Sequence, residues 1–141
     1  MSGTGDMHPG AIALRQQYRA MTDGDMPKVV QHFADDIYYE EPPLRVVAHS
    51  PAEIAKGYEP WLTCVRFAFP VLDAFGTGNR AALRWEMRGT LLKDMPGLVS
   101  PEHVGTTFVI HGVTVAEFND EQRIARCGCY WDFGAFAAQF Q

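Results

Sequence analysis

The chain has 141 residues, of which 47% are hydrophobic and 21% are charged, and its formal net charge at pH 7 is −5. This composition is typical of a globular chain with a substantial core, and it excludes an intrinsically disordered one. The acidic balance and the lack of a basic stripe argue against a nucleic-acid groove and against a site for an anionic membrane surface.

The sequence also bears on the compartment. It has no apolar run long enough to span a bilayer, and residues 1–10 lack the apolar segment of a signal peptide, so we expect a cytoplasmic protein. Three cysteines, Cys64, Cys127 and Cys129, do not predict a disulfide framework, because their number is odd and no export signal is present. The CGC string is too tight for a CxxC metal pair, so we expect buried thiols.

The N-terminal part predicts three helices and a strand. Residues 9–23 repeat apolar side chains on one helical face, and Asp25 is the expected N-cap of a second, short helix. The string IYYEEPP predicts a strand that its prolines end. The string SPAE, residues 50–53, is a capping box that opens a third helix.

The C-terminal part predicts two hairpins and a closing helix. The stretch 91–105 contains two prolines and two glycines and reads as a long loop, a type that often serves as a lid. Asp132 is the expected N-cap of the last helix. This order predicts a single α+β domain over residues 1–141, with helices against one face of a curved antiparallel sheet. The four expected strands of this part are 66–75, 80–90, 106–118 and 123–131.

The strand at 80–90 raises a question about its two faces. Its string ALRWEMRGT alternates apolar residues with Arg84, Glu86 and Arg88. The alternation alone favours Trp85 in the core and the charges in water. An inward-facing network of paired charges is the other interpretation, because an arginine can hold a buried carboxylate.

Three strings, YRAMTDGDMPKVVQHFADDIYYEEP, ALRWEMRGT and VTVAEFNDEQRI…YWD, resemble the nuclear transport factor 2-like superfamily. This superfamily includes the SnoaL-like polyketide cyclases, the ketosteroid isomerases and the limonene-epoxide hydrolases. The resemblance spans nearly the whole chain. It implies a cone-shaped, curved antiparallel sheet, with three N-terminal helices and a short C-terminal helix enclosing an apolar pocket, and a homodimer formed through the convex face. The fold hosts many chemistries, so no single activity is implied.

The resemblance implies roles for three charged residues. Glu41 stands where the ketosteroid isomerases carry their proton-shuttling aspartate and is the candidate base, whereas the alternative is a surface glutamate at a strand end. A carboxylate in an apolar wall has a raised pKa and can exchange protons near neutral pH. The string RWE matches the Arg-x-Asp of the epoxide hydrolases. This match implies that Arg84 and Glu86 face the pocket, with Glu86 as a second acid or base, and that Trp85 faces a partner or a second layer.

Other family positions are occupied by different residues. The isomerase tyrosine falls on Gln17, one residue before Tyr18, and the isomerase's protonated aspartate falls on Thr114. Thr114 and Cys129 also stand at the positions of the cyclase dyad, and Cys129 at that of the hydrolase's water-activating aspartate. A one-residue slip at the last turn would reverse these facings and bring in Tyr130. Cys129 as a nucleophile would need a nearby positive charge, so an inert buried thiol is the simpler interpretation.

Together these features predict a cofactor-free acid–base enzyme that isomerises, cyclises or opens the ring of a hydrophobic polyketide-, terpenoid- or steroid-like molecule. Glu41 acts as the proton shuttle, Arg84 holds Glu86, and Tyr39 and Thr114 donate hydrogen bonds to the developing charge. For the aromatic members of the predicted substrate site, core packing is an equal explanation. The substrate-binding residues that we predict are Tyr39, Thr114, Cys129, Trp61, Phe67, Phe108 and Trp131.

Two alternatives remain open. The first is a non-catalytic module of the same fold that binds a small ligand or dimerises, which the altered dyad positions favour. The second is an epoxide hydrolase, in which only Glu41 is available to replace the missing aspartate near Arg84. Convergence of Glu41 and Glu86 on one cavity would favour the enzyme, whereas scattered carboxylates that face the solvent would favour the binding module.

Overall fold

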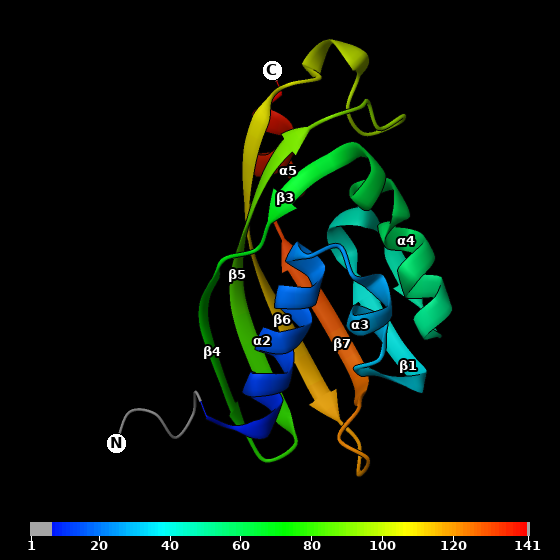
Figure 1. Ribbon diagram of the computed structural model, residues 1–141, viewed down its shortest axis with the longest axis vertical. Coiled ribbons are helices and arrows are strands. Elements are labelled where there is room, and N and C mark those ends of the chain that lie inside the picture. The colour runs from blue at the N-terminus through cyan, green and yellow to red at the C-terminus, as the bar shows by residue number, and fades with distance from the viewer. Residues whose placement is uncertain (1–6, 141) are drawn as a thin grey trace.

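The computed structural model describes residues 7–140 (Figure 1). Within this range the chain forms four α-helices and one seven-stranded sheet. The helices are α2 (Pro9–Thr22), α3 (Met26–Val30), α4 (Pro51–Cys64) and α5 (Phe133–Ala138), with the short 3-10 helices η1 (Pro42–Leu44) and η2 (Pro101–His103). The strands are β1 (Phe33–Glu41), β2 (Val46–Ala48), β3 (Val65–Ala68), β4 (Val71–Thr77), β5 (Arg80–Leu91), β6 (Thr107–Phe118) and β7 (Ile124–Trp131).

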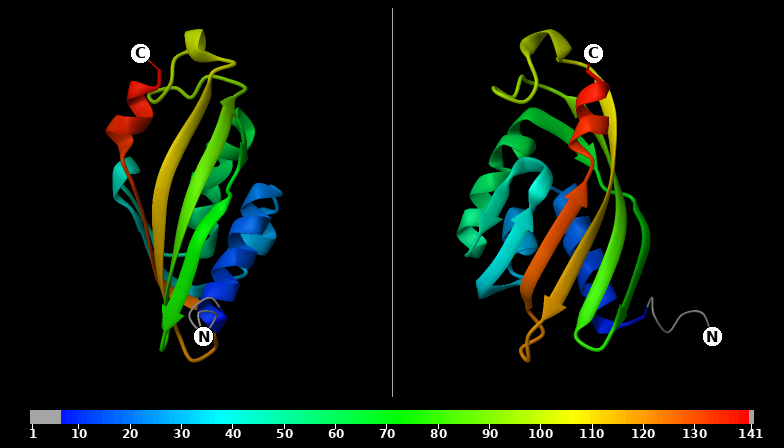
Figure 2. Two further views of the ribbon diagram at one scale, coloured as in Figure 1. Left: turned by 90° about the vertical axis from the view of Figure 1, so that its left-hand side faces the viewer. Right: turned by 180° about the vertical axis from the view of Figure 1, so that it is seen from behind.

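The sheet is curved and does not close on itself. Its strand order is β2-β1-β7-β6-β5-β3, and β4 pairs with β5 beside β3. Every pairing is antiparallel except that of β1 with β7, which is parallel. The helices α2, α3 and α4 lie in front of one face of the sheet in Figure 1, and we call this the inner face. The view from behind in Figure 2 shows β5, β6 and β7 in front of these helices, and this is the outer face. The predicted α+β class and the curved sheet with its helices are confirmed.

The helices begin where the sequence signals place them. The side chains of Asp25, Ser50 and Asp132 each accept a hydrogen bond from a backbone N–H in the first turn, at 3.2, 3.2 and 3.1 Å. Such caps pair N–H groups that have no partner within the helix, and each contributes about 1 kcal/mol. All three predicted N-caps are therefore confirmed.

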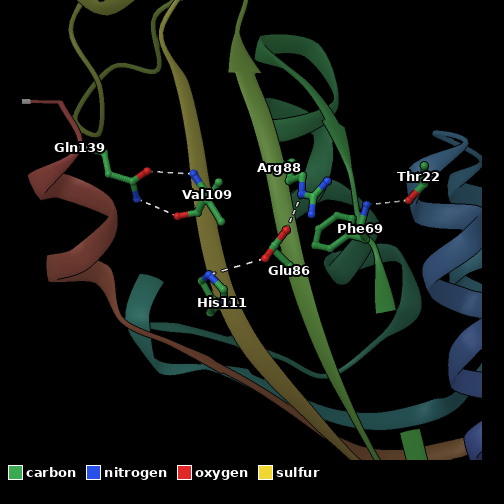
Figure 3. A network of polar contacts seen from close by, with 7 residues as sticks. All are labelled: Thr22, Phe69, Glu86, Arg88, Val109, His111 and Gln139. Atoms are coloured by element: carbon green, nitrogen blue, oxygen red, sulfur yellow. Dashed lines mark hydrogen bonds and ion pairs between the residues drawn. The ribbon is translucent and has the colours of Figure 1, made fainter. Parts of the chain in front are cut away.

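Two features of the sheet differ from the prediction. The expected strand 66–75 is divided into β3 and β4, because Pro70 lies between them and has no N–H to donate to a ladder. The free N–H of Phe69 instead donates to the side-chain oxygen of Thr22 at 2.9 Å (Figure 3). The strand β2 was not predicted, and neither was the parallel pairing of β1 with β7, which joins distant parts of the chain.

The orientation of β5 corrects the expectation that came from the family resemblance. Trp85 and Met87 are buried against the inner face with 5% and 4% exposure, whereas Arg84 is exposed on the outer face. Glu86 also lies on the outer face, where it contacts Arg88 and its Oε1 lies 3.7 Å from Nε2 of His111 (Figure 3). The physical reason is hydrophobic. Burial of each large apolar side chain stabilises the fold by roughly 1.5–3 kcal/mol, whereas inward charges would pay a desolvation cost.

No helix within residues 7–140 combines the length and the apolar character that crossing a membrane requires.

Candidate functional site

A cavity lies between the inner face of the sheet and the helices α2 and α4. It encloses about 500 Å³ of empty space when the volume open to solvent at its mouth is included. Most of its wall is aromatic or aliphatic, and Glu41 carries the only carboxylate among the lining residues. The cavity is lined by Tyr18, Met21, Glu41, Tyr58, Trp61, Leu62, Phe67, Phe69, Trp85, Met87, Ile110, Cys129 and Trp131.

Glu41 is the last residue of β1, and its half-buried side chain faces this cavity. The alternation of the strand puts Tyr39 on the same face, and the Tyr39 hydroxyl donates to Glu41 Oε1 at 2.7 Å. The indole N–H of Trp131, from β7, donates to Oε2 at 2.7 Å. Both carboxylate oxygens are thus held in place. Burial raises the pKa of Glu41 above its ordinary value, and the two hydrogen bonds oppose that rise. The carboxyl group therefore holds a proton more readily than an exposed glutamate does.

A tyrosine pair extends this arrangement toward α4. The hydroxyls of Tyr39 and Tyr58 lie 2.8 Å apart. Because the Tyr39 hydroxyl already uses its proton in the hydrogen bond to Glu41, it is the Tyr58 hydroxyl that donates to the oxygen of Tyr39. Burial raises the pKa of both tyrosines well above its ordinary value, so both remain protonated donors. The result is a directed chain of hydrogen bonds from Tyr58 through Tyr39 to Glu41.

A second polar cluster is centred on Thr114, which lies behind the cavity wall and contacts three lining residues. The indole N–H of Trp85 donates to the hydroxyl oxygen of Thr114 at 3.0 Å, and the Tyr18 hydroxyl is also hydrogen-bonded to Thr114. The sulfur of Cys129 lies 3.4 Å from Thr114 Oγ1 and 3.5 Å from the Tyr39 hydroxyl. Cys129 therefore connects the two clusters. Buried polar atoms that are all hydrogen-bonded avoid the desolvation cost of unpaired groups and hold one arrangement.

The register of β6 and β7 decides which residues face inward. Thr114 and Cys129 are directly paired, and both are buried on the inner face, as the unshifted alignment predicted. Tyr130 lies on the outer face with 42% exposure, where its hydroxyl donates to Glu40 at 2.9 Å. An irregularity in the pairing occurs beside Phe118, next to the turn, and does not reverse these facings.

Counting along the family pattern misplaced the tyrosine of α2. Tyr18 lines the cavity, whereas the buried side chain of Gln17 donates to the carbonyl oxygen of Val29 at 3.1 Å. The prediction that Gln17 takes the tyrosine's place in the site is therefore wrong. Successive helical residues point about 100° apart, so packing of α2 against α3 determines which of the two faces the sheet.

Arg84 and Glu86 are not brought together with Glu41. They lie on the outer face, on the opposite side of the sheet from the cavity. Arg84 is therefore not positioned to lower the pKa of the Cys129 thiol, and the arginine–acid arrangement implied by the epoxide hydrolases does not form inside the cavity.

The remaining predicted residues divide into three groups. Trp61, Phe67, Cys129 and Trp131 line the cavity. Tyr39 and Thr114 lie behind it and contact lining residues through the hydrogen bonds given above. Phe108 does not reach the cavity.

Phe108 instead packs under α5 and over Gly89. Its ring lies 5.3 Å from the ring of Phe136 and 5.5 Å from that of Phe140. Gly89 has no side chain, and the space this leaves is filled by the Phe108 ring. The expectation that Phe108 binds substrate in this cavity is therefore corrected. The long loop at 91–105, considered as a lid, supplies none of the lining residues.

Several lining residues were not predicted as part of the site. Tyr18 and Met21 are three residues apart on α2, and Tyr58 and Leu62 are four apart on α4, so each pair shares a helical face. That periodicity marks an inward face in the sequence. It does not separate a cavity wall from a filled core, which is why these residues were missed. No group of three or more His, Cys, Asp or Glu side chains in the described part of the chain is arranged to hold a metal ion.

A curved sheet around an apolar cavity, closed by N-terminal helices, defines the nuclear transport factor 2-like class of folds. A family model described as the SnoaL-like domain matches residues 14–127, which is more than half of the chain. The chain therefore belongs to the SnoaL-like family, as its sequence motifs indicated. No curated protein sequence shows significant similarity to it.

Solved structures with the same fold are numerous. A proposed polyketide cyclase from Pseudomonas putida is similar at 21% identity with a TM-score of 0.83, over 94% of this chain and 98% of that one. One from Xanthomonas campestris is 18% identical with a TM-score of 0.85, over 96% and 99%. A hypothetical protein with a ketosteroid isomerase-like fold from Catenulispora acidiphila is 14% identical with a TM-score of 0.74, over 91% of each chain. At these identities the likeness establishes the fold.

Proposed function

We propose that the protein is an acid–base enzyme that acts on a hydrophobic small molecule of polyketide, terpenoid or steroid type, by isomerisation, cyclisation or ring opening. One observation carries the proposal. The carboxyl group of Glu41 has a raised pKa, faces an aromatic cavity, and is oriented by hydrogen bonds from Tyr39 and Trp131. A carboxylate with these properties is suited to general-base catalysis.

In the proposed reaction the Glu41 carboxylate removes a proton from a carbon next to a carbonyl group of the substrate. The electron pair of the broken C–H bond forms a C=C bond to the carbonyl carbon, and the π electron pair of the C=O bond moves to the oxygen. The protonated Glu41 then returns the proton at another atom, and the C=O bond forms again. The hydroxyls of Tyr18 and Tyr58 line the same cavity, and one of them would turn from its partner Thr114 or Tyr39 to donate to the oxygen that gains negative charge. The apolar wall excludes water, which strengthens these electrostatic interactions.

The comparisons support the coarser part of this proposal. The chain belongs to the SnoaL-like family, and two similar structures are described as proposed polyketide cyclases. The particular substrate and reaction type are the parts of the proposal that need experiment.

The test follows proton abstraction directly. A panel of hydrophobic ketones and polycyclic carbonyl compounds is incubated with the protein in D₂O, and the exchange of the hydrogen next to the carbonyl is followed by proton NMR. We expect exchange by the wild type and a loss of at least about 100-fold in Glu41→Gln, within the range that general-base catalysis contributes.

Glu86→Gln is the matched control, because it removes the same charge from the outer face and should keep the wild-type rate. Full activity in Glu41→Gln would contradict the proposal.

The second candidate function is a non-catalytic module that binds a small ligand. It is favoured by the outward facing of Glu86, which does not converge with Glu41 on the cavity. It is also favoured by the neutral residues Thr114 and Cys129, which stand at positions where the resemblance implied catalytic side chains. Saturable ligand binding in the cavity, with no exchange of any panel compound, would favour this function over the enzyme.

A further inference from the structure

Among the described residues, the cavity is lined by one acidic side chain and by no basic side chain. Glu41 is the only acidic side chain among the lining residues, and no lysine, arginine or histidine in the described part of the chain is among them. The three arginines of β5, Arg80, Arg84 and Arg88, are exposed and point to the outer face. A negative group that enters the cavity therefore meets a carboxylate and no side-chain cation.

Each ligand charge has a different consequence here. An anion would lose its hydration without gaining a positive partner, and it would be repelled by ionised Glu41 across a medium of low dielectric constant. A cation would pair with Glu41, but the pairing has to offset the hydration that the cation loses on burial, and it would lower the pKa of the carboxyl group and weaken it as a base. An uncharged ligand avoids both effects and still gains from burial against the aromatic wall.

We propose that the cavity selects a ligand whose inserted part is uncharged, and that the Glu41 carboxylate rejects ligands with an anionic group in that part. This inference rests on the proposed function, in which Glu41 must stay free to accept a proton. It narrows the substrate class to neutral carbonyl compounds, and it excludes free carboxylic acids and phosphates whose charged group would have to enter the cavity.

The chain carries a built-in reporter for this selection. It has three tryptophans, and all of them, Trp61, Trp85 and Trp131, line the cavity. Intrinsic tryptophan fluorescence therefore responds to occupation of the cavity and has no background from tryptophans elsewhere.

The experiment compares three probes of similar shape and different charge at pH 8. The probes are 2-acetylnaphthalene, which is uncharged, 2-naphthalenesulfonate, which is anionic, and 2-naphthyltrimethylammonium, which is cationic. Each is titrated into the wild type, Glu41→Gln and Glu86→Gln. Binding is followed by tryptophan fluorescence and, because the probes absorb light, by calorimetry as well.

We expect the wild type to bind the ketone at least tenfold more tightly than the sulfonate. In Glu41→Gln the ratio of the affinity for the ketone to the affinity for the sulfonate should fall at least tenfold. The affinity for the ketone should stay within threefold of the wild type, which shows that the cavity is intact. Glu86→Gln should keep the wild-type ratio of ketone affinity to sulfonate affinity, because Glu86 lies on the outer face.

Several results would overturn the inference. Equal affinity of the wild type for ketone and sulfonate would remove the selection, and so would tighter binding of the ammonium than of the ketone. If the ketone-to-sulfonate affinity ratio were unchanged in Glu41→Gln, the proposed role of Glu41 in the selection would be contradicted. If Glu41→Gln did not fold, Glu41→Met would take its place, and the wild-type comparison would stand by itself.

The outcomes also separate this inference from the proposed function. Proton exchange on a panel ketone together with equal binding of ketone and sulfonate would leave the enzyme proposal intact and reject the charge selection. Charge selection without any exchange would favour the binding module. Failure of all three probes to bind would contradict both proposals.

Discussion

At the scale of single residues, the site depends on what surrounds one carboxyl group. Tyr39 is two residues from Glu41 on the same strand, whereas Trp131 is 90 residues further along the chain. Burial and hydrogen bonding shift the pKa of Glu41 in opposite directions. Two substitutions separate these effects.

We expect Tyr39→Phe to raise the pKa of Glu41 further, because the lost hydrogen bond stabilises the ionised form. The variant should also lose about 1 kcal/mol of unfolding free energy. The pKa is measured by carbon-13 NMR titration of glutamate carboxyl groups. Tyr38→Phe, one residue earlier and facing the other side of β1, is the control and should leave the Glu41 resonance unchanged. A Glu41 pKa that falls in Tyr39→Phe would contradict this account.

The raised pKa of Glu41 also makes stability depend on pH. Between the unfolded and the folded pKa the folded state binds more protons, so the free energy of unfolding decreases as pH rises. The stability associated with protonated Glu41 is complete below the unfolded pKa and is lost as pH rises through the folded pKa. We therefore expect Glu41→Gln to gain stability relative to the wild type as the pH rises above about 4, the unfolded pKa of a glutamate, until the folded pKa of Glu41 has been passed. Urea unfolding at each pH measures the difference in the free energy of unfolding between Glu41→Gln and the wild type. A difference that does not change with pH would contradict this expectation.

At the scale of elements, the cavity wall requires close contact between neighbouring strands. Gly112 of β6 is paired with Trp85 of β5, and the Trp85 ring covers the Gly112 backbone. This position lets the indole lie flat and reach Thr114 with its N–H. A glycine in the middle of a strand thus supports the site by having no side chain.

We expect Gly112→Ala to cost about 1–3 kcal/mol, because the added Cβ would overlap the Trp85 ring and displace it. Tryptophan emission should change as the hydrogen bond to Thr114 is lost. Gly57→Ala is the matched control. No atom lies within 4 Å of a Cβ at this helical position, so the same substitution should stabilise the protein by about 0.4–1 kcal/mol. Urea unfolding measures the free energy of unfolding of both variants. Equal values for Gly112→Ala and Gly57→Ala would contradict this role of Gly112.

At the scale of the whole molecule, the outer face of the sheet carries both charged and apolar side chains. Glu86, Arg88 and His111 form the polar part shown in Figure 3. Val109 and Val115 of β6 are 38% and 44% exposed beside them. Apolar side chains gathered on one face are typical of protein–protein interfaces.

We expect a homodimer formed through this outer face, as the family resemblance implied. Analytical ultracentrifugation should give twice the mass of one chain. Val115→Arg should weaken the association at least tenfold, because it places a charge within the interface. Val104→Arg, at a similarly exposed position in the loop before β6, should leave it unchanged. A monomeric wild type would contradict the expectation.

The elements that the sequence determined by itself are those formed by short-range interactions. The N-caps Asp25, Ser50 and Asp132 act on backbone groups within a few residues, and the alternation around Trp85 needs only the geometry of one strand. The position of Glu41 at a strand end, next to an apolar wall, was also accessible from the sequence through the family resemblance.

Only the tertiary structure decided how these elements combine. The choice of Tyr18 over Gln17 and the displacement of Phe108 under α5 both depend on packing against distant elements. The hydrogen bond from Trp131 to Glu41 requires the parallel pairing of β1 with β7, which no local pattern encodes. Burial of apolar surface selects one arrangement of the sheet and helices, and that arrangement determines which polar groups meet inside it.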